Sequence, residues 1–131
     1  MRLAVPVALI ATILVLVVGG GTRPPGSVQP IAWNRESCAH CRMLIGDPAY
    51  AAQIITEDGD VLSFDDPGCA ARYLRERRPR VHRAWFHAGR GDAWLPLAEV
   101  GFVPATASPM GSNVMAVPKA TPGAIPLEAL R

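Results

Sequence analysis

The sequence has little of what several protein classes require. Its 13 basic and 11 acidic residues nearly cancel, and the formal charge of +2 gives no strongly basic surface for nucleic acid. It has no residue period and is 50% hydrophobic, which excludes collagen, a coiled coil and outright disorder. Aromatic residues make up only 6%, against 13 prolines and 12 glycines in 131 residues. We therefore expect one loop-rich domain with a modest core.

Charge is absent from Leu3 to Val18, a segment that would measure about 24 Å as a helix. With Gly19 to Gly21 it approaches the roughly 30 Å of a membrane core. It is followed neither by an Ala-x-Ala cleavage site nor by a Cys for lipid attachment. We expect residues 1–21 to be an uncleaved transmembrane anchor or a cleaved export signal, with a buried core helix as the remaining alternative. Either favoured reading places the rest on the exported, periplasmic or extracytoplasmic side of the membrane.

The next part of the chain predicts an α+β domain. Residues 22–32, rich in Gly, Pro and Ser, read as a flexible linker. Two strands, 50–56 and 61–64, flank the turn at 57–60. A helix follows at 67–77, with Asp66 as its cap and Pro67 in its first position, and Val81 to Phe86 is a third strand. Together these elements form a β-β-α-β unit.

The remaining residues predict a partial second unit. Short strands are expected at 101–103 and 113–117, which would complete a small domain spanning residues 33–117. Residues 118–131 contain three prolines and are expected to form a loose, Pro-rich tail.

Sulfur donors are concentrated in one short segment. Cys38 and Cys41, three residues apart, can both turn toward one soft metal ion, and Met43 adds a thioether. Thiolates with thioethers favour Cu(I), whereas zinc rarely takes Met and a second Cys pair is lacking. The segment predicts a Cu(I) site with two thiolates, a methionine completing a three-coordinate shell, and His40 as a supplementary donor.

Other candidate donors lie further along the chain. Met110 stands between Pro109 and Gly111, an unusual place for core packing, so ligation and packing are equally consistent with it. Met115 lies within a predicted strand, which favours packing. We expect Cys69, in the first helical turn, to be a buried packing thiol, although exposure there would lower its pKa. We expect structural roles for two histidines, His82 and His87, as surface or core side chains. The adjacent Asp65 and Asp66 are expected to be turn and helix-cap residues.

Two non-copper alternatives remain open. Cys38 and Cys41 with an intervening His resemble the active site of thiol-disulfide oxidoreductases, in which the His lowers a thiol pKa. Those enzymes place the motif after a strand and at a helix start, a context that this segment lacks. The other alternative is a structural or docking module whose cysteines only form a disulfide. No serine is placed with a His partner, and we expect no enzymatic activity.

Considered together, the motifs are similar to a known family. Five segments carry the similarity: Cys38-x-x-Cys41-x-Met43, Asp47-x-x-Tyr50-Ala51-Ala52-Gln53-Ile54, Asp58-Gly59, Phe64-Asp65-Asp66-x-Gly68-Cys69 and Ser108-Pro109-Met110-Gly111. Together they resemble the NosL family of exported copper-binding accessory proteins, which are associated with nitrous oxide reductase. The resemblance covers roughly residues 36–117. It implies a domain of β-β-α-β units that binds one Cu(I) through Cys38, Cys41, Met43 and Met110.

The resemblance also implies partners. A copper enzyme such as nitrous oxide reductase, or its assembly machinery, would receive the metal outside the cytoplasm. Two departures from the family are visible. Gly19 to Gly21 stand where members carry the acylated Cys, and after the Pro-Met-Gly motif the sequence lacks the family's further helix and strand, so the second half looks truncated.

Overall fold

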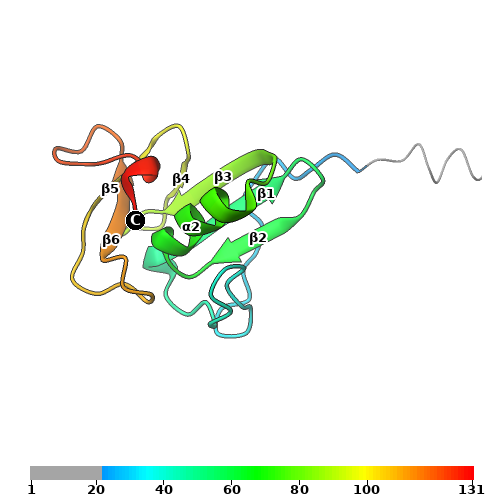
Figure 1. The fold of residues 1–131 in the computed structure, drawn as a ribbon, viewed down its shortest axis with the longest axis horizontal. Helices are drawn as coiled ribbons and strands as arrows, with labels where there is room; N and C mark the ends of the chain where they lie inside the picture. Colours follow the sequence, from blue (N-terminus) through cyan, green and yellow to red (C-terminus); the bar gives the residue numbers. More distant parts are fainter. Residues whose placement is uncertain (1–21) are drawn as a thin grey trace, which may run out of the picture.

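The computed structural model describes residues 22–131, and the anchor or signal expected at residues 1–21 lies outside this range. One α-helix and two β-sheets form the described part (Figure 1). This confirms the small α+β domain predicted from the sequence. No helix between residues 22 and 131 has both the length and the apolar character needed to cross a membrane.

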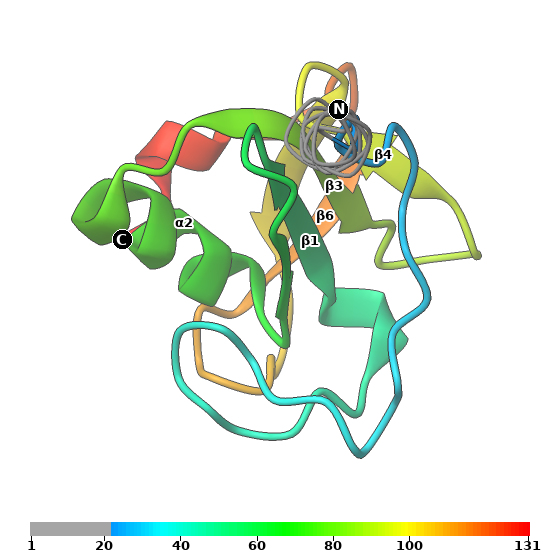
Figure 2. The same ribbon diagram turned by 90° about the vertical axis from the view of Figure 1, so that its right-hand side faces the viewer.

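The larger sheet has four antiparallel strands in the order β2-β1-β3-β4. Their bounds are β1 (Ala52–Thr56), β2 (Val61–Phe64), β3 (Val81–His87) and β4 (Trp94–Pro96). Every residue of β1 is buried. Figure 2 shows α2 on one side of β1, whereas the segment that begins at residue 22 descends on the other side.

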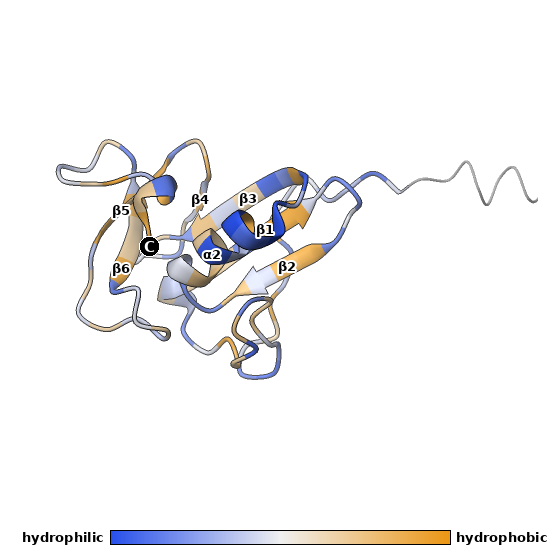
Figure 3. Ribbon diagram, viewed as in Figure 1, coloured by the Kyte–Doolittle hydropathy of each residue, from blue (hydrophilic) through white to orange (hydrophobic). Residues whose placement is uncertain are grey.

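Helix α2 (Pro67–Arg77) has the bounds that the sequence predicts. The Asp66 side chain accepts a hydrogen bond from the Gly68 N–H, which caps the helix start. Arg78 adopts a left-handed conformation, with φ of 46°, and ends the helix just before Pro79. The first half of the helix is buried, whereas the arginine-rich second half is largely hydrophilic (Figure 3).

A second, two-stranded sheet pairs β5 (Val100–Pro104) with β6 (Val114–Pro118) in antiparallel register. A parallel bridge between Ala88 and Ala116 joins it to the first sheet. The rings of Phe86 and Phe102 meet edge to face with centroids 5.1 Å apart. The two sheets therefore share one hydrophobic core.

Two details of the strands differ from the sequence prediction. β1 begins at Ala52 because Pro48–Tyr50 form a 3₁₀ helix, η1, whose Ala49 N–H is capped by the Asp47 side chain. The short strand β4 was not expected, because three residues that end in a proline give little strand signal. The strand predicted at 101–103 is present and extends one residue further at each end, and the strand predicted at 113–117 is present one residue further along the chain.

Both segments expected to be loose make specific contacts. The Gln29 N–H donates to Gln53 Oε1 at 2.7 Å, which ties the end of residues 22–32 to β1. At the other terminus, Leu127 and Leu130 are buried, and Arg75 donates a hydrogen bond to the Leu130 carbonyl. The two leucines, which follow the last of the three prolines, thus pack on the domain, in contrast to the loose tail expected for residues 118–131.

Candidate metal centre

A tight turn presents Cys38 and Cys41. Its base is a bridge between Ser37 and Leu44. Inside this bridge the Cys38 N–H donates to the Met43 carbonyl at 2.8 Å, and the Arg42 N–H donates to the Cys38 carbonyl at 3.1 Å. Arg42 takes a positive φ of 69°, which reverses the chain direction. The turn holds the two thiols on one short, hydrogen-bonded segment.

The turn is fixed to the larger sheet. The Ala39 N–H donates to the Ser63 carbonyl at 2.9 Å, so the segment between the two cysteines lies beside the end of β2. Ile45, at the other side of the turn, is fully buried and donates its N–H to the Glu36 carbonyl. These contacts set the position of both thiols before any ligand arrives.

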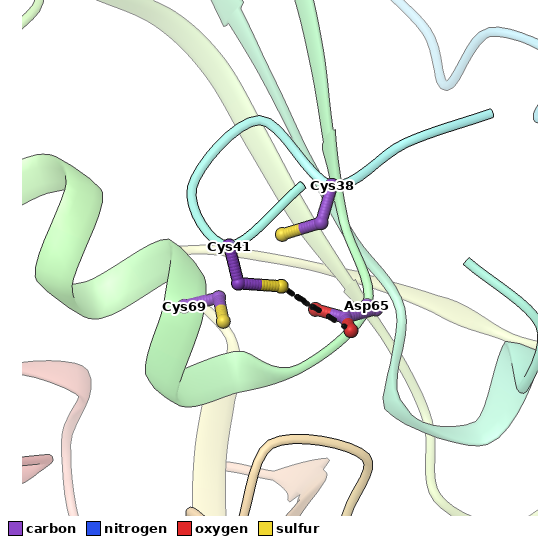
Figure 4. A group of neighbouring side chains, drawn as sticks. All are labelled: Cys38, Cys41, Asp65 and Cys69. Atoms are coloured by element: carbon purple, nitrogen blue, oxygen red, sulfur yellow. Dashed lines mark hydrogen bonds between the residues drawn. The ribbon is translucent and has the colours of Figure 1, made fainter. Parts of the chain in front are cut away.

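The junction between β2 and α2 supplies the other two members of the site. Asp65 directly follows Phe64, the last residue of β2, and Cys69 lies in the first turn of α2. The Cys69 N–H donates to the Asp66 carbonyl at 3.0 Å, as the first turn of a capped helix requires. Figure 4 shows the Cys69 and Asp65 side chains converging with those of the turn.

Four ligand atoms gather here. The three Sγ atoms of Cys38, Cys41 and Cys69 and a carboxylate oxygen of Asp65 all lie within 4.8 Å of one another. Three sulfurs around one metal ion at about 2.3 Å would be about 4 Å apart, so a shift of about an ångström would suffice for shared ligation. Cys38, Cys69 and Asp65 are buried, Cys41 is partly exposed, and all three cysteines are free thiols.

The carboxylate of Asp65 has an unusual environment. Cys41 Sγ lies 3.4 Å from its Oδ1 and 3.5 Å from its Oδ2, so the thiol donates to both oxygens. Among residues 22–131, no backbone N–H hydrogen-bonds to this carboxylate and no basic side chain pairs with it. An acid that is only 2% exposed is thus surrounded chiefly by sulfur.

These surroundings separate the pKa values of the four groups. The pKa of Cys38 is lowered to about 4, chiefly because the Cys69 thiol can donate a hydrogen bond to its thiolate. Burial raises the pKa of Cys41 to about 11, and the same Cys38 thiolate raises the pKa of Cys69. Burial, together with Cys38, raises the pKa of Asp65 to about 6. Near neutral pH the cluster therefore holds one thiolate, two thiols and an ionised carboxylate.

Three donors predicted from the sequence lie outside this cluster. His40 points its Nδ1 toward Glu76 Oε2 at 3.9 Å and is not among the four converging side chains. Met43 is 57% exposed on the turn, and Met110 is 38% exposed. The Met110 N–H donates to Asp66 Oδ2 at 3.0 Å, which holds its loop beside the helix start. Ligation by these three residues stays a prediction.

A close backbone approach keeps the Met110 loop in place. A Cβ added to Gly68 would lie 2.7 Å from the Ser112 Cβ, so a larger residue there would push the loop away. The absence of a side chain at Gly68 thus allows residues 108–112 to rest on the first turn of α2, near Cys69.

Asp65 and Cys69 are the members of the cluster that the sequence prediction did not identify. Of the two aspartates interpreted as structural, only Asp66 caps α2, whereas Asp65 faces the thiols. Cys69 is buried as expected, and it also faces the other two sulfurs. Adjacent residues at a strand end point in opposite directions, which was the available signal for Asp65. His87 is buried against Trp94, as expected for a core side chain.

A small α+β domain with three buried or half-buried thiols and a carboxylate around one point belongs to the class of domains that can bind a metal ion. Its fold is similar to that in the crystal structure of the copper chaperone NosL from Shewanella denitrificans, with a TM-score of 0.57 and 17% sequence identity. The match covers 71% of this chain and 79% of that chain. The NosL-like fold expected from the motifs is thereby confirmed. No protein-family model matches the sequence, and no curated protein matches it.

Proposed function

We propose that this protein is a copper carrier that binds one Cu(I) ion at the thiols of Cys38, Cys41 and Cys69. The observation that carries the proposal is the convergence of three free sulfurs within 4.8 Å of one another from two separate chain segments. The similarity of the fold to a copper chaperone supports it. In this proposal Cys69 joins the two cysteines predicted from the sequence.

The chemistry of the donors favours Cu(I). Thiolate is a soft ligand and Cu(I) a soft ion, and three thiolates suit a three-coordinate shell. Cys38 is fully buried and Cys69 is 1% exposed, so water has little access to two of the three sulfurs. Such a dry pocket slows oxidation of both the metal and its ligands.

The metal is proposed to be cargo, because one side of the site is open. Cys41 is partly exposed, and the side chains of Met43 and Met110 reach the surface on loops that flank the cluster. We propose that these two thioethers, together with His40 of the Cys turn, serve as outer donors during transfer. A ligand of the recipient could then bind copper through the exposed side before the buried thiolates release it.

The proposal also covers where the protein is located and which protein receives its copper. We propose that the chain is held on the exported side of the cytoplasmic membrane by residues 1–21. From there it would deliver copper to a copper enzyme such as nitrous oxide reductase, or to factors that assemble the enzyme's copper site. These statements rest on the apolar segment and on the family resemblance of the sequence motifs.

The geometry argues against the thiol-disulfide oxidoreductase alternative. A catalytic thiol must be both exposed and low in pKa. Here the two properties are divided, since Cys38 has the lowered pKa but no exposed surface. The accessible Cys41 has a pKa raised to about 11, which keeps it protonated and a poor nucleophile. The carrier function fits this division better.

Competitive titration tests the proposed function. The full-length chain, solubilised in mild detergent and kept reduced, would be titrated with Cu(I) against a chromophoric Cu(I) chelator. We expect one tightly bound ion, and loss of tight binding in a Cys38→Ala, Cys41→Ala double variant. Met115→Leu, a volume-conserving change in β6, is the control. Unchanged affinity in the double variant would refute the assignment of the site.

A further inference from the structure

We propose that Asp65 is a fourth ligand that allows the same cluster to hold a divalent ion, Zn(II), in a closed tetrahedral site. The inference rests on the proposed function to the extent that it uses the same three thiols. It adds a second metal, a second coordination number and a role for a carboxylate that the copper proposal leaves unused.

The first argument is the contrast between two adjacent acids. Asp66 is fully buried, and its oxygens accept hydrogen bonds from the Gly68 and Met110 N–H groups at 2.7 and 3.0 Å. Asp65 is equally buried, yet no backbone N–H among residues 22–131 donates to its carboxylate. A buried carboxylate without such partners costs free energy unless a cation compensates it. Because three thiols lie beside this carboxylate, a metal ion that binds sulfur and oxygen together is the cation that suits the site.

The second argument is the arrangement of the donors. Cys38 and Cys41 have the two-residue spacing common in structural zinc sites, and Cys69 and Asp65 supply the other pair from the strand-to-helix junction. Three Cys with one oxygen or nitrogen ligand is an ordinary zinc set. In the metal-free cluster the Cys41 thiol hydrogen bonds to Asp65, and a zinc ion would replace that proton between sulfur and oxygen.

The third argument is charge. Three thiolates and one carboxylate carry four negative charges, of which Zn(II) neutralises two and Cu(I) only one. The carboxylate oxygen is a hard donor that zinc accepts readily and Cu(I) does not favour. An ionised Asp65 therefore stabilises the zinc complex, whereas beside three Cu(I)-bound thiolates it adds repulsion. The side chain should distinguish the two metals.

Substitution of Asp65 tests this distinction. Full-length reduced protein would be titrated with Zn(II) against a chromophoric zinc chelator and, separately, with Cu(I) as above. We expect Asp65→Asn to weaken Zn(II) binding at least about tenfold while Cu(I) affinity stays within about threefold of wild type. Asp58→Asn, which removes the same charge from an exposed turn, is the control and should leave both affinities unchanged.

Each other result has a defined meaning. Equal Zn(II) affinity in the wild type and Asp65→Asn would overturn the proposal, as would wild-type protein that binds Cu(I) but no Zn(II). Loaded with Co(II) as a probe, the wild type should show the intense visible absorption of a four-coordinate thiolate site, and a six-coordinate spectrum would overturn the proposal without any variant. Retained Cu(I) binding shows that Asp65→Asn is folded. Failure of the copper proposal would instead appear as unchanged Cu(I) binding in the Cys38→Ala, Cys41→Ala variant.

Discussion

The thiol of Cys41 donates to the carboxylate of Asp65, with Sγ 3.4 Å from Oδ1 and 3.5 Å from Oδ2. The partly exposed sulfur of the cluster is thereby connected to its buried acid. Any metal that takes both groups must displace the proton between them. The protonation of the cluster and its metal affinity are consequently linked.

Copper binding should strengthen with rising pH. Cys38 is already a thiolate at neutral pH, with a pKa of about 4, whereas the pKa of Cys41 is about 11 and that of Cys69 is also raised. Ligation by all three thiolates then releases about two protons, and the logarithm of the apparent affinity should rise by about two per pH unit between about pH 7 and 9. Chelator competition at several pH values, corrected for the chelator's own protonation, measures this slope. A flat profile would contradict the three-thiolate site.

Removal of Cys69 should reveal whether it is a ligand. We expect Cys69→Ala to weaken Cu(I) binding by about tenfold to a hundredfold, because one of the three thiolate ligands is lost. The Cys38 thiolate would also lose the neighbour that lowers its pKa. The matched control is Ala71→Ser, a change of similar size at another buried position in the first half of α2. If Cys69 is only a packing thiol, the Cu(I) affinity measured above about pH 9 will equal that of wild type.

The exposed methionines should act on transfer rate more than on affinity. In a Met43→Leu, Met110→Leu double variant we expect equilibrium Cu(I) affinity within about threefold of wild type and release to a competing chelator slowed several-fold, since outer thioether donors are lost. Stopped-flow mixing of the loaded protein with chelator provides the rate. Met115→Leu serves as the comparison. A large loss of affinity in this double variant would place at least one of the two methionines among the primary ligands, as the sequence motif predicts.

Asp65 should also make the stability of the metal-free protein depend on pH. Its pKa of about 6 in the folded state exceeds the ordinary value of 3.8, so the folded chain binds this proton more tightly than the unfolded chain. The contribution of this group to the free energy of unfolding is therefore greatest below about pH 4 and declines as pH rises to about 6, by at most about 3 kcal/mol. Cys38, with its lowered pKa, has the opposite sign.

The difference between wild type and Asp65→Asn isolates this effect. Urea unfolding at several pH values should show the variant gaining stability relative to wild type as pH rises from about 4 to 6. A constant difference across that range would show that the carboxylate is not destabilised by its surroundings.

The C-terminal segment should contribute to stability. Leu127 is 7% exposed, and Leu127→Ala should lower the free energy of unfolding by about 2 kcal/mol. Glu128→Ala, at the exposed neighbouring position, is the control and should change it by less than about 0.5 kcal/mol. Denaturant unfolding gives both values. Equal stability of the two variants would mean that residues 118–131 are loosely attached after all.

Local signals explain which parts of the fold could be predicted. Helix α2 was predicted with its bounds because Asp66, Pro67 and Pro79 mark its ends by mechanisms that act within a few residues. The hairpin of β1 and β2 follows from two short, mainly apolar segments on either side of the turn at 57–60. The buried Leu127 and Leu130 could not be predicted, since their burial depends on distant residues.

The site residues, too, separate into a pair that could be predicted from the sequence and a pair that could not. The pair Cys38 and Cys41 is a local motif and was recognised as a metal ligand pair. Cys69 and Asp65 join it only through the topology, because the strand-to-helix junction folds back onto the Cys turn at the end of β2. A lone cysteine in a helix carries no sign of this in the sequence, and the alternation of the two adjacent aspartates shows only that Asp65 and Asp66 face different ways.

The two chain segments that meet at the cluster have a thermodynamic consequence. An ion held by the turn at Cys38 and Cys41 and by the start of α2 would act as a cross-link that closes a loop of the unfolded chain. Metal loading should therefore protect backbone amides in both segments from hydrogen exchange together. Release of copper to a recipient would loosen both, so an unloaded carrier differs from a loaded one in local rigidity as well as in charge.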